Sequence, residues 1–366
     1  MESIVTIEAS SPVSHLLPLA VKGLKSMYDE KRGLFCYRLQ KTDSGVTLEG
    51  ASHRYTMMSL LGLIRARSAG LLSPIDIEAA VDRLLSDTSW VDNIGDLGLL
   101  LWLCSDTSEK HAREFFRKFN LSSALESYPD ARRRHTMELS WFLNGLVHAC
   151  KKNAQTDLQS LSYQILQMVK ANQGSHGLFG HMSKSGSLAG FVRGQIGSFA
   201  DQVYPILALA HFSQVFGDEG AKAAASRCGN AICARQGSLG QWWWHYDSLT
   251  GKVVQRYPVY SVHQHAMGPM ALIALEEFLG EDFRVPINEG LKWINGANEL
   301  GKDLEEAELG VVWRCIRLPK ATGYAAALAG CMGMENRHRS FHILYECRPY
   351  ELGWLLYAFA RPGTRR

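Results

Sequence analysis

Apolar residues recur at helical spacing along almost the whole chain, and the strict alternation that is typical of strands is rare. The pattern predicts helices in pairs, in which a more polar helix precedes one rich in Gly, Ala and aromatic residues. The first helices of these pairs fall near residues 14–28, 74–88, 109–121, 156–172, 219–236 and 285–298. The second helices fall near residues 51–69, 93–105, 134–151, 195–216, 259–280 and 349–360.

The two kinds of helix differ in the surface that they must bury. The polar set suits an outer ring, whereas the apolar set suits an inner ring in which small residues allow helices to approach closely. An example is the run Met57-Met58-Ser59-Leu60-Leu61-Gly62-Leu63. We therefore predict an all-α fold, an (α/α)6 toroid of six helical hairpins, built by residues 1–366 as one domain. Its sixth hairpin carries an insertion at residues 300–348, with a short strand at 311–316.

Local signals mark several helix ends. Gly217 and Gly280 stand just past apolar helices, where glycine commonly ends a helix in the left-handed conformation. The pair Ser73-Pro74 has the composition of a helix start, with serine as the cap and proline in the first turn. These signals predict where the second hairpin begins and where the fourth and fifth hairpins end.

One loop motif occurs three times, which is typical of a chain built from copies of one supersecondary unit. The copies are Gly33-Leu34-Phe35-Cys36-Tyr37, Gly177-Leu178-Phe179-Gly180-His181 and the longer segment from Gly240 to Tyr246. Each precedes a long apolar helix with a serine near its start, namely Ser52, Ser198 and Ser261. Because the second helices all begin where such loops end, we expect their N-termini to open on one rim. Helix N-termini favour anionic groups.

Composition excludes some classes of protein. The 39 basic and 36 acidic residues are interspersed and the net charge is +3, so no nucleic-acid partner is predicted. The first residues lack the basic start of a signal peptide, and no apolar run has the length of a membrane span. The 8 cysteines include no CxxC pair, which favours free thiols in a reducing compartment. We therefore expect a cytoplasmic protein.

Polar and ionisable residues gather at the predicted starts of the inner helices. Helix packing alone does not require such groups at equivalent positions, so we select the candidates there, with a cap or surface role as the alternative for each. The candidate catalytic residues are Glu138, Asp201, Tyr257, Tyr260 and His263. The candidate substrate-binding residues are Glu49, His53, Arg54, Arg193, Trp242, Trp243, Trp244, Arg256 and His265.

The segment 240–265 holds the highest density of these candidates. Trp242, Trp243 and Trp244 are consecutive, so they either fill the core or stack on the flat apolar face of a sugar. On a helix, His263 and His265 point about 200° apart, so a shared metal ion is not expected. We predict no metal and no cofactor. His263 is better suited to acid/base chemistry or to orienting a substrate.

Several enzyme signatures are absent from the sequence. It contains no P-loop, no HExxH and no GxSxG nucleophile motif. The aspartate-rich clusters of terpene cyclases are also missing, although a terpene cyclase would show similar helical periodicity. These absences leave the rim residues as the carriers of any chemistry.

Two stretches resemble the C-terminal helical domain of D-glucuronyl C5-epimerases. The run Ser140-Trp141-Phe142-Leu143-Asn144-Gly145-Leu146 is similar to that family's Ser-Phe-Val-Leu-Asn-Gly-Phe, and residues 256–265 are similar in layout to its segment with Arg, Tyr and a later His-Ile-Asn-Gln. The family's Glu-Tyr before this helix is replaced by Arg134-His135. The resemblance implies Tyr257 or Tyr260 as an acid/base. More broadly, the chain resembles α/α-toroid proteins that act on glycans, which include epimerases, polysaccharide lyases and glycoside hydrolases.

The leading hypothesis is an enzyme that acts on a sugar or a uronate-containing glycan. Epimerisation or elimination would use a Tyr or His base, with Arg54, Arg193 or Arg256 neutralising the sugar carboxylate. Hydrolysis would use two carboxylates among Glu49, Glu138 and Asp201. The excess of His, Tyr and Arg at the rim favours proton abstraction. A terpene-cyclase-like enzyme with Asp201 as proton donor and a non-catalytic glycan-binding scaffold are the alternatives.

Overall fold

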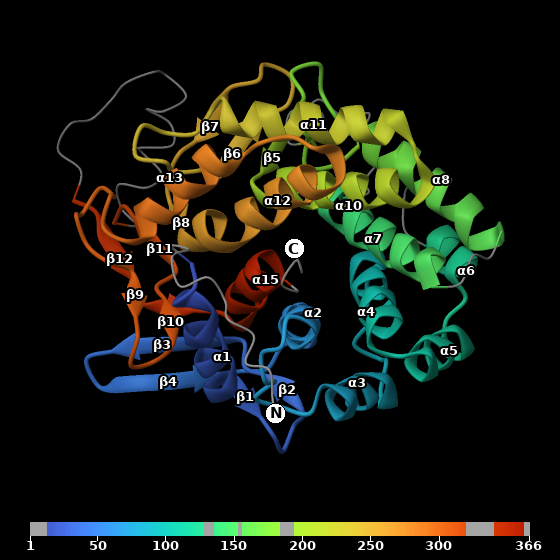
Figure 1. Cartoon of the computed structure of the whole chain (residues 1–366), viewed down its shortest axis with the longest axis horizontal. Coiled ribbons are helices and arrows are strands. Elements are labelled where there is room, and N and C mark those ends of the chain that lie inside the picture. The colour runs from blue at the N-terminus through green and yellow to red at the C-terminus, as the bar shows by residue number, and fades with distance from the viewer. Residues whose placement is uncertain (1–12, 128–134, 153–155, 184–193, 320–339, 362–366) are drawn as a thin grey trace, which may run out of the picture.

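The computed structural model describes residues 13–127, 135–152, 156–183, 194–319 and 340–361. Its helices form two concentric rings, as predicted for an α/α toroid (Figure 1). The ring is closed, because each inner helix packs against the next and the last packs against the first. The inner helices are α2 (His53–Ser68), α4 (Ile94–Thr107), α7 (Thr136–Lys152), α10 (Ala200–Phe216), α12 (Gly268–Leu279) and α15 (Pro349–Phe359).

The outer helices cover the inner ring at its perimeter. Each of α5, α8 and α11 packs mainly against the inner helix that precedes it in the chain, so the tight hairpins run from an inner helix to an outer one. A further helix, α6 (Leu121–Ser127), follows α5 and was not separated in the sequence analysis. The outer helices are α1 (Leu16–Met27), α3 (Ile77–Ser86), α5 (Glu109–Lys118), α8 (Thr156–Lys170), α11 (Glu219–Cys233) and α13 (Arg284–Ile294).

The inner helices are buried on all sides. In α10, every residue from Asp201 to Ser213 is buried, and in α2 the same holds from Thr56 to Leu63. A helix that is apolar around its whole circumference belongs in the interior of a large protein. None of the described helices is long and apolar enough to cross a membrane.

Glycines set the close spacing of neighbouring inner helices. A Cβ atom added to Gly62 would lie 2.0 Å from the carbonyl oxygen of Gly353, on α15. A Cβ atom added to Gly145 of α7 would lie 2.3 Å from the carbonyl oxygen of Gly98 on α4. The prediction that small residues allow close packing in the inner ring is therefore confirmed at these two helix pairs.

Replacing Gly62 by alanine is expected to lower the free energy of unfolding by about 3 kcal/mol, because α2 and α15 must separate to admit the methyl group. The measurement is the midpoint of guanidinium unfolding. Gly220→Ala is the matched control, since its added Cβ meets no backbone atom, only the side-chain ends of Lys170 and Asp218, and alanine favours a helix. An unchanged midpoint for Gly62→Ala would contradict the close approach of these two helices.

The predicted helix ends are confirmed in two cases and wrong in one. Gly217 and Gly280 end α10 and α12 with φ of 66° and 71°, in the left-handed region that favours glycine. The predicted start at Ser73-Pro74 is wrong, because α3 begins at Ile77 with Asp76 as its N-cap. The hydroxyl of Ser73 donates to the carbonyl of Ile75, which stabilises a turn before the helix.

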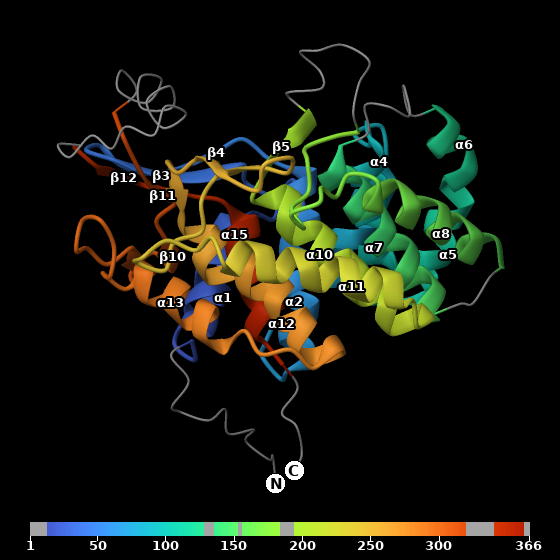
Figure 2. The ribbon, with the colours of Figure 1, turned by 90° about the horizontal axis from the view of Figure 1, so that it is seen from above.

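Short strands join the long loops on one side of the toroid (Figure 2). The predicted strand at 311–316 is observed as two strands, β10 (Val311–Val312) and β11 (Cys315–Arg317). Two pairs are β1 (Tyr28–Asp29) with β2 (Leu34–Phe35), and β9 (Glu305–Glu306) with β10 (Val311–Val312). Three three-stranded sheets combine β3 (Arg38–Thr42), β4 (Gly45–Glu49) and β13 (Glu346–Cys347); β5 (Ile196–Ser198), β6 (His245–Asp247) and β7 (Val253–Gln255); and β8 (Val259–Tyr260), β11 (Cys315–Arg317) and β12 (His342–Leu344).

The repeated loop motif has a common structure. Its glycines Gly33, Gly177 and Gly240 have φ of 67°, 84° and 85°, so each loop turns in a conformation that other residues rarely adopt. The aromatic residue two positions later is fully buried in every copy. Its backbone N–H donates to a side chain of the following inner helix, or of the turn that leads into it. The pairs are Phe35 with Thr56, Phe179 with Gln202, and Trp242 with Gln264, which lies just before α12. The motif thus anchors each loop to the inner helix that follows it through one hydrogen bond and one buried aromatic side chain.

Candidate functional site

A cavity of about 250 Å³ opens at the end of the toroid where the inner helices begin. Five of the six inner-helix starts contribute to it, which agrees with the predicted convergence on one rim. Its lining consists of aromatic and apolar side chains with a few polar groups, the usual composition of a small-molecule site. The lining residues are Arg54, Tyr55, Met58, Met137, Trp141, Ser198, Ala200, Tyr204, Trp244, Tyr260, Val262, His263, Met267, Arg314 and Tyr350.

Arg54 brings one guanidinium group into this lining from the first turn of α2. Its Nε and Nη2 donate to the two carboxylate oxygens of Asp96 at 2.6 and 2.8 Å, a bidentate pair. The amide of Asn93 donates to the same carboxylate, and the guanidinium lies 5.4 Å from the ring of Trp141. The one inner helix without a lining residue, α4, therefore reaches the cavity indirectly, through Asp96.

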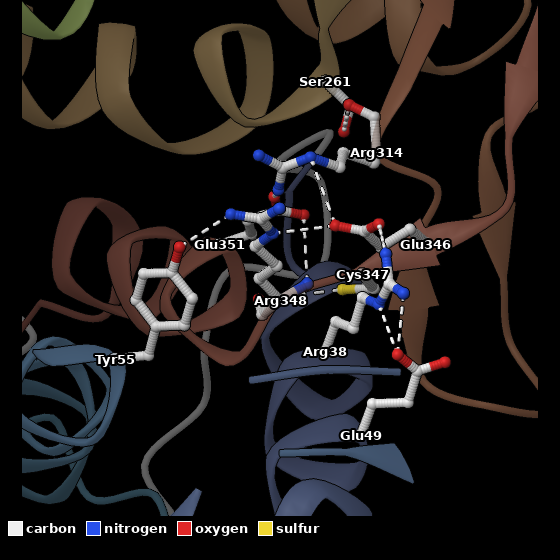
Figure 3. A network of polar contacts seen from close by, with 9 residues as sticks. All are labelled: Arg38, Glu49, Tyr55, Ser261, Arg314, Glu346, Cys347, Arg348 and Glu351. Carbon is white, nitrogen blue, oxygen red and sulfur yellow. Dashed lines mark hydrogen bonds and ion pairs between the residues drawn. The ribbon is translucent and has the colours of Figure 1, made fainter. Parts of the chain in front are cut away.

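Arg314 brings a second guanidinium group, from the segment that leads into β11 (Figure 3). Its Nη1 donates to Glu351, its Nε lies 3.5 Å from a carboxylate oxygen of Glu346, and the guanidinium lies 5.1 Å from the ring of Tyr260. Burial opposes the charge, but the Glu351 carboxylate raises the pKa of Arg314 above its ordinary value. The N–H and hydroxyl of Ser261 both donate to the Arg314 carbonyl, which holds the backbone in place.

The ion pairs continue outward from Arg314 to the surface (Figure 3). Arg348 donates to Glu346 at 2.7 Å and to the hydroxyl of Tyr55 at 2.7 Å. Arg38 donates to Glu346 at 3.0 Å and to Glu49 at 2.7 Å. The network ties β3, β4 and β13 to the wall of the cavity.

Glu138 lies beside the cavity, between the lining residues Met137 and Trp141 in the first turn of α7. Burial raises the pKa of its carboxyl above the ordinary value, while the charge of Arg54 opposes that shift. The ring of His135 lies 3.4 Å from the carboxylate. A carboxyl group with a raised pKa retains its proton at higher pH, which is the property required of a general acid.

Asp201 lies at the start of α10, next to the lining residues Ser198 and Ala200. One carboxylate oxygen accepts hydrogen bonds from the N–H and hydroxyl of Ser198, both at 2.8 Å, and lies 3.1 Å from Nδ1 of His181. Among the described residues, the other oxygen has no hydrogen-bond partner although it is buried. The rings of His181 and His135 are 4.6 Å apart, so the surroundings of Asp201 and Glu138 are contiguous.

The fold matches solved structures, whereas no protein-family model and no curated protein sequence matches the chain. One match is the unsaturated glucuronyl hydrolase of Streptococcus agalactiae, with a TM-score of 0.62 and 10% identity over 96% of this chain and 92% of that chain. The enzyme of Bacillus sp. GL1 matches with a TM-score of 0.60 and 12% identity over 95% and 94%. A possible member of the GH105 family from Salmonella enterica matches with a TM-score of 0.62 and 13% identity over 97% and 95%.

The chain has the fold of the unsaturated glucuronyl hydrolases. The predicted resemblance to α/α-toroid proteins is thus confirmed for the fold. The resemblance to C5-epimerases stays a prediction.

In this glucuronyl-hydrolase fold, three of the candidates from segment 240–265 line the cavity. They are Trp244, Tyr260 and His263. Burial raises the pKa of Tyr260 to about 12 and lowers the pKa of His263 to about 3. The backbone from His263 to Met267 forms a π-helical turn, η2, which places His263 in the cavity wall, whereas Tyr260 comes from the end of β8. Such turns interrupt helices frequently at functional sites.

Three substrate-binding candidates are buried away from the cavity, which corrects the sequence interpretation. Trp242 is fully buried, since its indole packs over Gly268 and Gly290, where a Cβ atom would lie 2.6 and 2.9 Å from the ring. Trp243 is buried as well, and its indole N–H donates to the carbonyl of Arg235. His265 is fully buried and is not part of the cavity lining. The alternative role of the first two indoles as core is therefore the one observed.

The other candidates lie on the rim outside the lining, or beyond the described residues. The hydroxyl of Tyr257 donates to Glu299 at 2.8 Å. The ring of His53 stacks on Trp90 at 4.8 Å, and the guanidinium of Arg256 lies 5.3 Å from the ring of Trp243. Glu49 pairs with Arg38 at the outer end of the network described above. Arg193 falls outside the described residues.

The sequence analysis missed Arg314 and Tyr350 as lining residues. Tyr350 precedes Glu351 in the first turn of α15, a position equivalent to the selected candidates, so its signal was present. Arg314 stands next to a short strand inside the insertion, where no helical periodicity marks it. Its place in the wall depends on the pairing of β11 with β8, which joins Cys315 to Tyr260.

Proposed function

We propose that this protein is a hydrolase that releases a terminal uronate from an oligosaccharide. One observation carries the proposal: an aromatic-lined cavity holds two guanidinium groups, those of Arg54 and Arg314, and has the carboxyl of Glu138 beside it. Guanidinium groups bind carboxylates through paired hydrogen bonds, and aromatic faces bind the apolar faces of sugar rings. The combination fits a sugar that carries a carboxylate.

The size of the cavity fits a single sugar unit. Sites for small molecules commonly have volumes of about 300–1,000 Å³. A cavity of about 250 Å³ is slightly smaller than this range, so it takes one ring and leaves the rest of an oligosaccharide outside. We infer that the enzyme acts at a chain end and not within a polymer.

The acid/base properties of the lining favour hydrolysis over proton abstraction. A general base must be deprotonated near the working pH. Burial raises the pKa of Tyr260 to about 12, so its phenol stays protonated, and it lowers the pKa of His263 to about 3, which makes that imidazole a weak base. We propose Glu138 as the general acid that protonates the departing group, and Asp201 with its neighbour His181 as the group that activates water.

The charges of the cavity disfavour the isoprenoid alternative. A terpene cyclase stabilises a carbocation with aromatic faces. Two guanidinium groups in the same small cavity would repel such an intermediate, whereas they attract a uronate.

The known activities of the structural neighbours support the proposal. One is described as an unsaturated glucuronyl hydrolase specific for heparin, and the enzyme of Bacillus sp. GL1 as responsible for glycosaminoglycan degradation. A variant of the Streptococcus agalactiae enzyme was solved in complex with dGlcA-GalNAc6S. These proteins are 10–14% identical to this chain over nearly its full length, so the likeness concerns the fold, and the cavity residues carry the chemistry.

The proposal is tested by incubating the protein with a disaccharide that ends in an unsaturated glucuronate and following the ultraviolet absorbance of its double bond. Water attacks C1 and the glycosidic bond breaks; the ring of the released sugar then opens to an enol, which tautomerises to a ketone. We therefore expect the absorbance of the double bond to fall as the uronate is released. A new double bond formed from a saturated uronate would indicate a lyase, and deuterium uptake at C5 without cleavage would indicate an epimerase. Tight binding without any reaction would indicate a glycan-binding module, and binding of prenyl diphosphates alone would contradict the whole proposal.

A further inference from the structure

The two guanidinium groups of the cavity differ in how many donors they have left for a ligand. Arg54 directs both Nε and Nη2 at Asp96, so one of the two edges of its guanidinium that can bind a carboxylate is already occupied. Arg314 donates through Nη1 to Glu351, and its Nε lies at the longer distance of 3.5 Å from Glu346. Among the described residues, Nη2 of Arg314 makes no hydrogen bond. Arg314 lines the cavity and therefore retains a donor nitrogen that its carboxylate partners do not occupy.

The position of Arg314 is determined by groups on three separate elements. Ser261, at the entry to η2, binds its carbonyl through both N–H and hydroxyl. Glu351 of α15 and Glu346 of β13 hold the guanidinium, and their side chains are 0% and 4% exposed. A buried arginine with this support loses little rotamer freedom when a ligand binds, because that freedom is already lost on folding.

Glu346 is shared among three arginines. Its carboxylate accepts from Arg348 at 2.7 Å and from Arg38 at 3.0 Å, and it lies 3.5 Å from Nε of Arg314 (Figure 3). The two shorter contacts of the Glu346 carboxylate go to Arg348 and Arg38. Glu346 therefore orients the guanidinium of Arg314 by charge attraction and does not occupy all of its N–H donors. Helix N-termini that converge on the cavity add a favourable potential for an anion.

We propose that Arg314 is the specificity-determining residue that binds the carboxylate of the terminal sugar, and that Glu346 is its positioning residue. This inference rests on the proposed function, and it assigns the preference for an acidic over a neutral sugar to the insertion at 300–348. Arg54 then acts mainly through its bidentate pair with Asp96.

Binding is measured by calorimetry with two probes, methyl glucuronide and methyl glucoside, which differ only at C6. Arg314→Gln is expected to weaken binding of the glucuronide by about 10- to 100-fold, the loss of hydrogen bonds to a charged group, and to leave the glucoside unchanged. Glu346→Gln is expected to weaken glucuronide binding about 3- to 10-fold, and Arg314→Lys to recover part of the loss because it restores the charge without the fork.

Arg317→Gln is the matched control, since Arg317 lies three residues further on, at the end of β11, contacts His342 and does not line the cavity. It should bind both probes like the parent. If Arg314→Gln does not fold, the double variant Arg314→Met with Glu351→Met replaces the buried pair by apolar groups and should keep the fold without the preference. Equal weakening of both probes, or an unchanged preference for glucuronide, would overturn the assignment. Absent turnover by the parent would instead refute the proposed hydrolysis and leave this binding test valid.

Discussion

Glu138→Gln is expected to lower turnover of an unsaturated glucuronyl disaccharide by at least about 100-fold, with little change in KM and in the unfolding midpoint. General acid catalysis contributes about 10²- to 10⁴-fold to rate, and glutamine has the shape of glutamate without a transferable proton. The side chain is partly exposed, so no buried charge is left unpaired by the change. The measurement is kcat and KM, from initial rates over a range of substrate concentrations that reaches saturation.

The pH dependence gives an independent check on the same residue. Burial raises the pKa of Glu138 above its ordinary value, so the protonated form persists to higher pH. For a general acid, the parent rate is therefore highest below this raised pKa and falls as pH rises through it. In the Glu138→Gln variant, the residual rate should lose this descending limb.

Glu219→Gln serves as the matched control. Glu219 is also in the first turn of a helix, α11, so it is close to the same kind of helix dipole, but its side chain is 83% exposed and remote from the cavity. It should keep parental turnover and the parental pH profile. Turnover by Glu138→Gln within a few-fold of the parent would remove this residue from the mechanism and shift attention to Asp201.

Acid should destabilise the protein steeply, because the imidazoles of His211, His263 and His265 are all buried and burial lowers the pKa of each. Burial lowers the pKa of both His263 and His265 to about 3, whereas a histidine in the unfolded chain titrates near pH 6.5. Below pH 6.5 the unfolded chain therefore binds a proton at each of His263 and His265 that the folded chain does not. The stability conferred by these groups is full above that pH and is lost as pH falls toward 3.

Each of these histidines contributes a slope of about 1.4 kcal/mol per pH unit, so the pair should cost about 4 kcal/mol of unfolding free energy between pH 7 and pH 5. The measurement is guanidinium unfolding at a series of pH values. His265→Gln should reduce the slope by one proton and the double variant with His263→Gln by two, relative to the parent. If the unfolding free energy of the parent and of all the variants fell equally with pH, these imidazoles would be protonated in the folded state as they are in the unfolded chain.

The site was predictable in part. Candidates were selected because polar groups recurred at inner-helix starts, and this logic located Arg54, Tyr260 and His263 in the cavity wall and Glu138 and Asp201 beside it. The same logic overestimated Trp242 and Trp243, which are buried. An aromatic residue next to a glycine turn gives the same sequence signal whether its ring faces a cavity or the core.

The sequence by itself determined the order, the approximate bounds and the inner or outer position of the helices. These depend on local periodicity and on glycines such as Gly217 and Gly240, whose positive φ few other residues tolerate. Only the tertiary structure decided which side chains share a cavity. Arg54 and Arg314 meet because α15 closes the ring on α2 and β11 pairs with β8, contacts between segments far apart in the chain that no local pattern encodes.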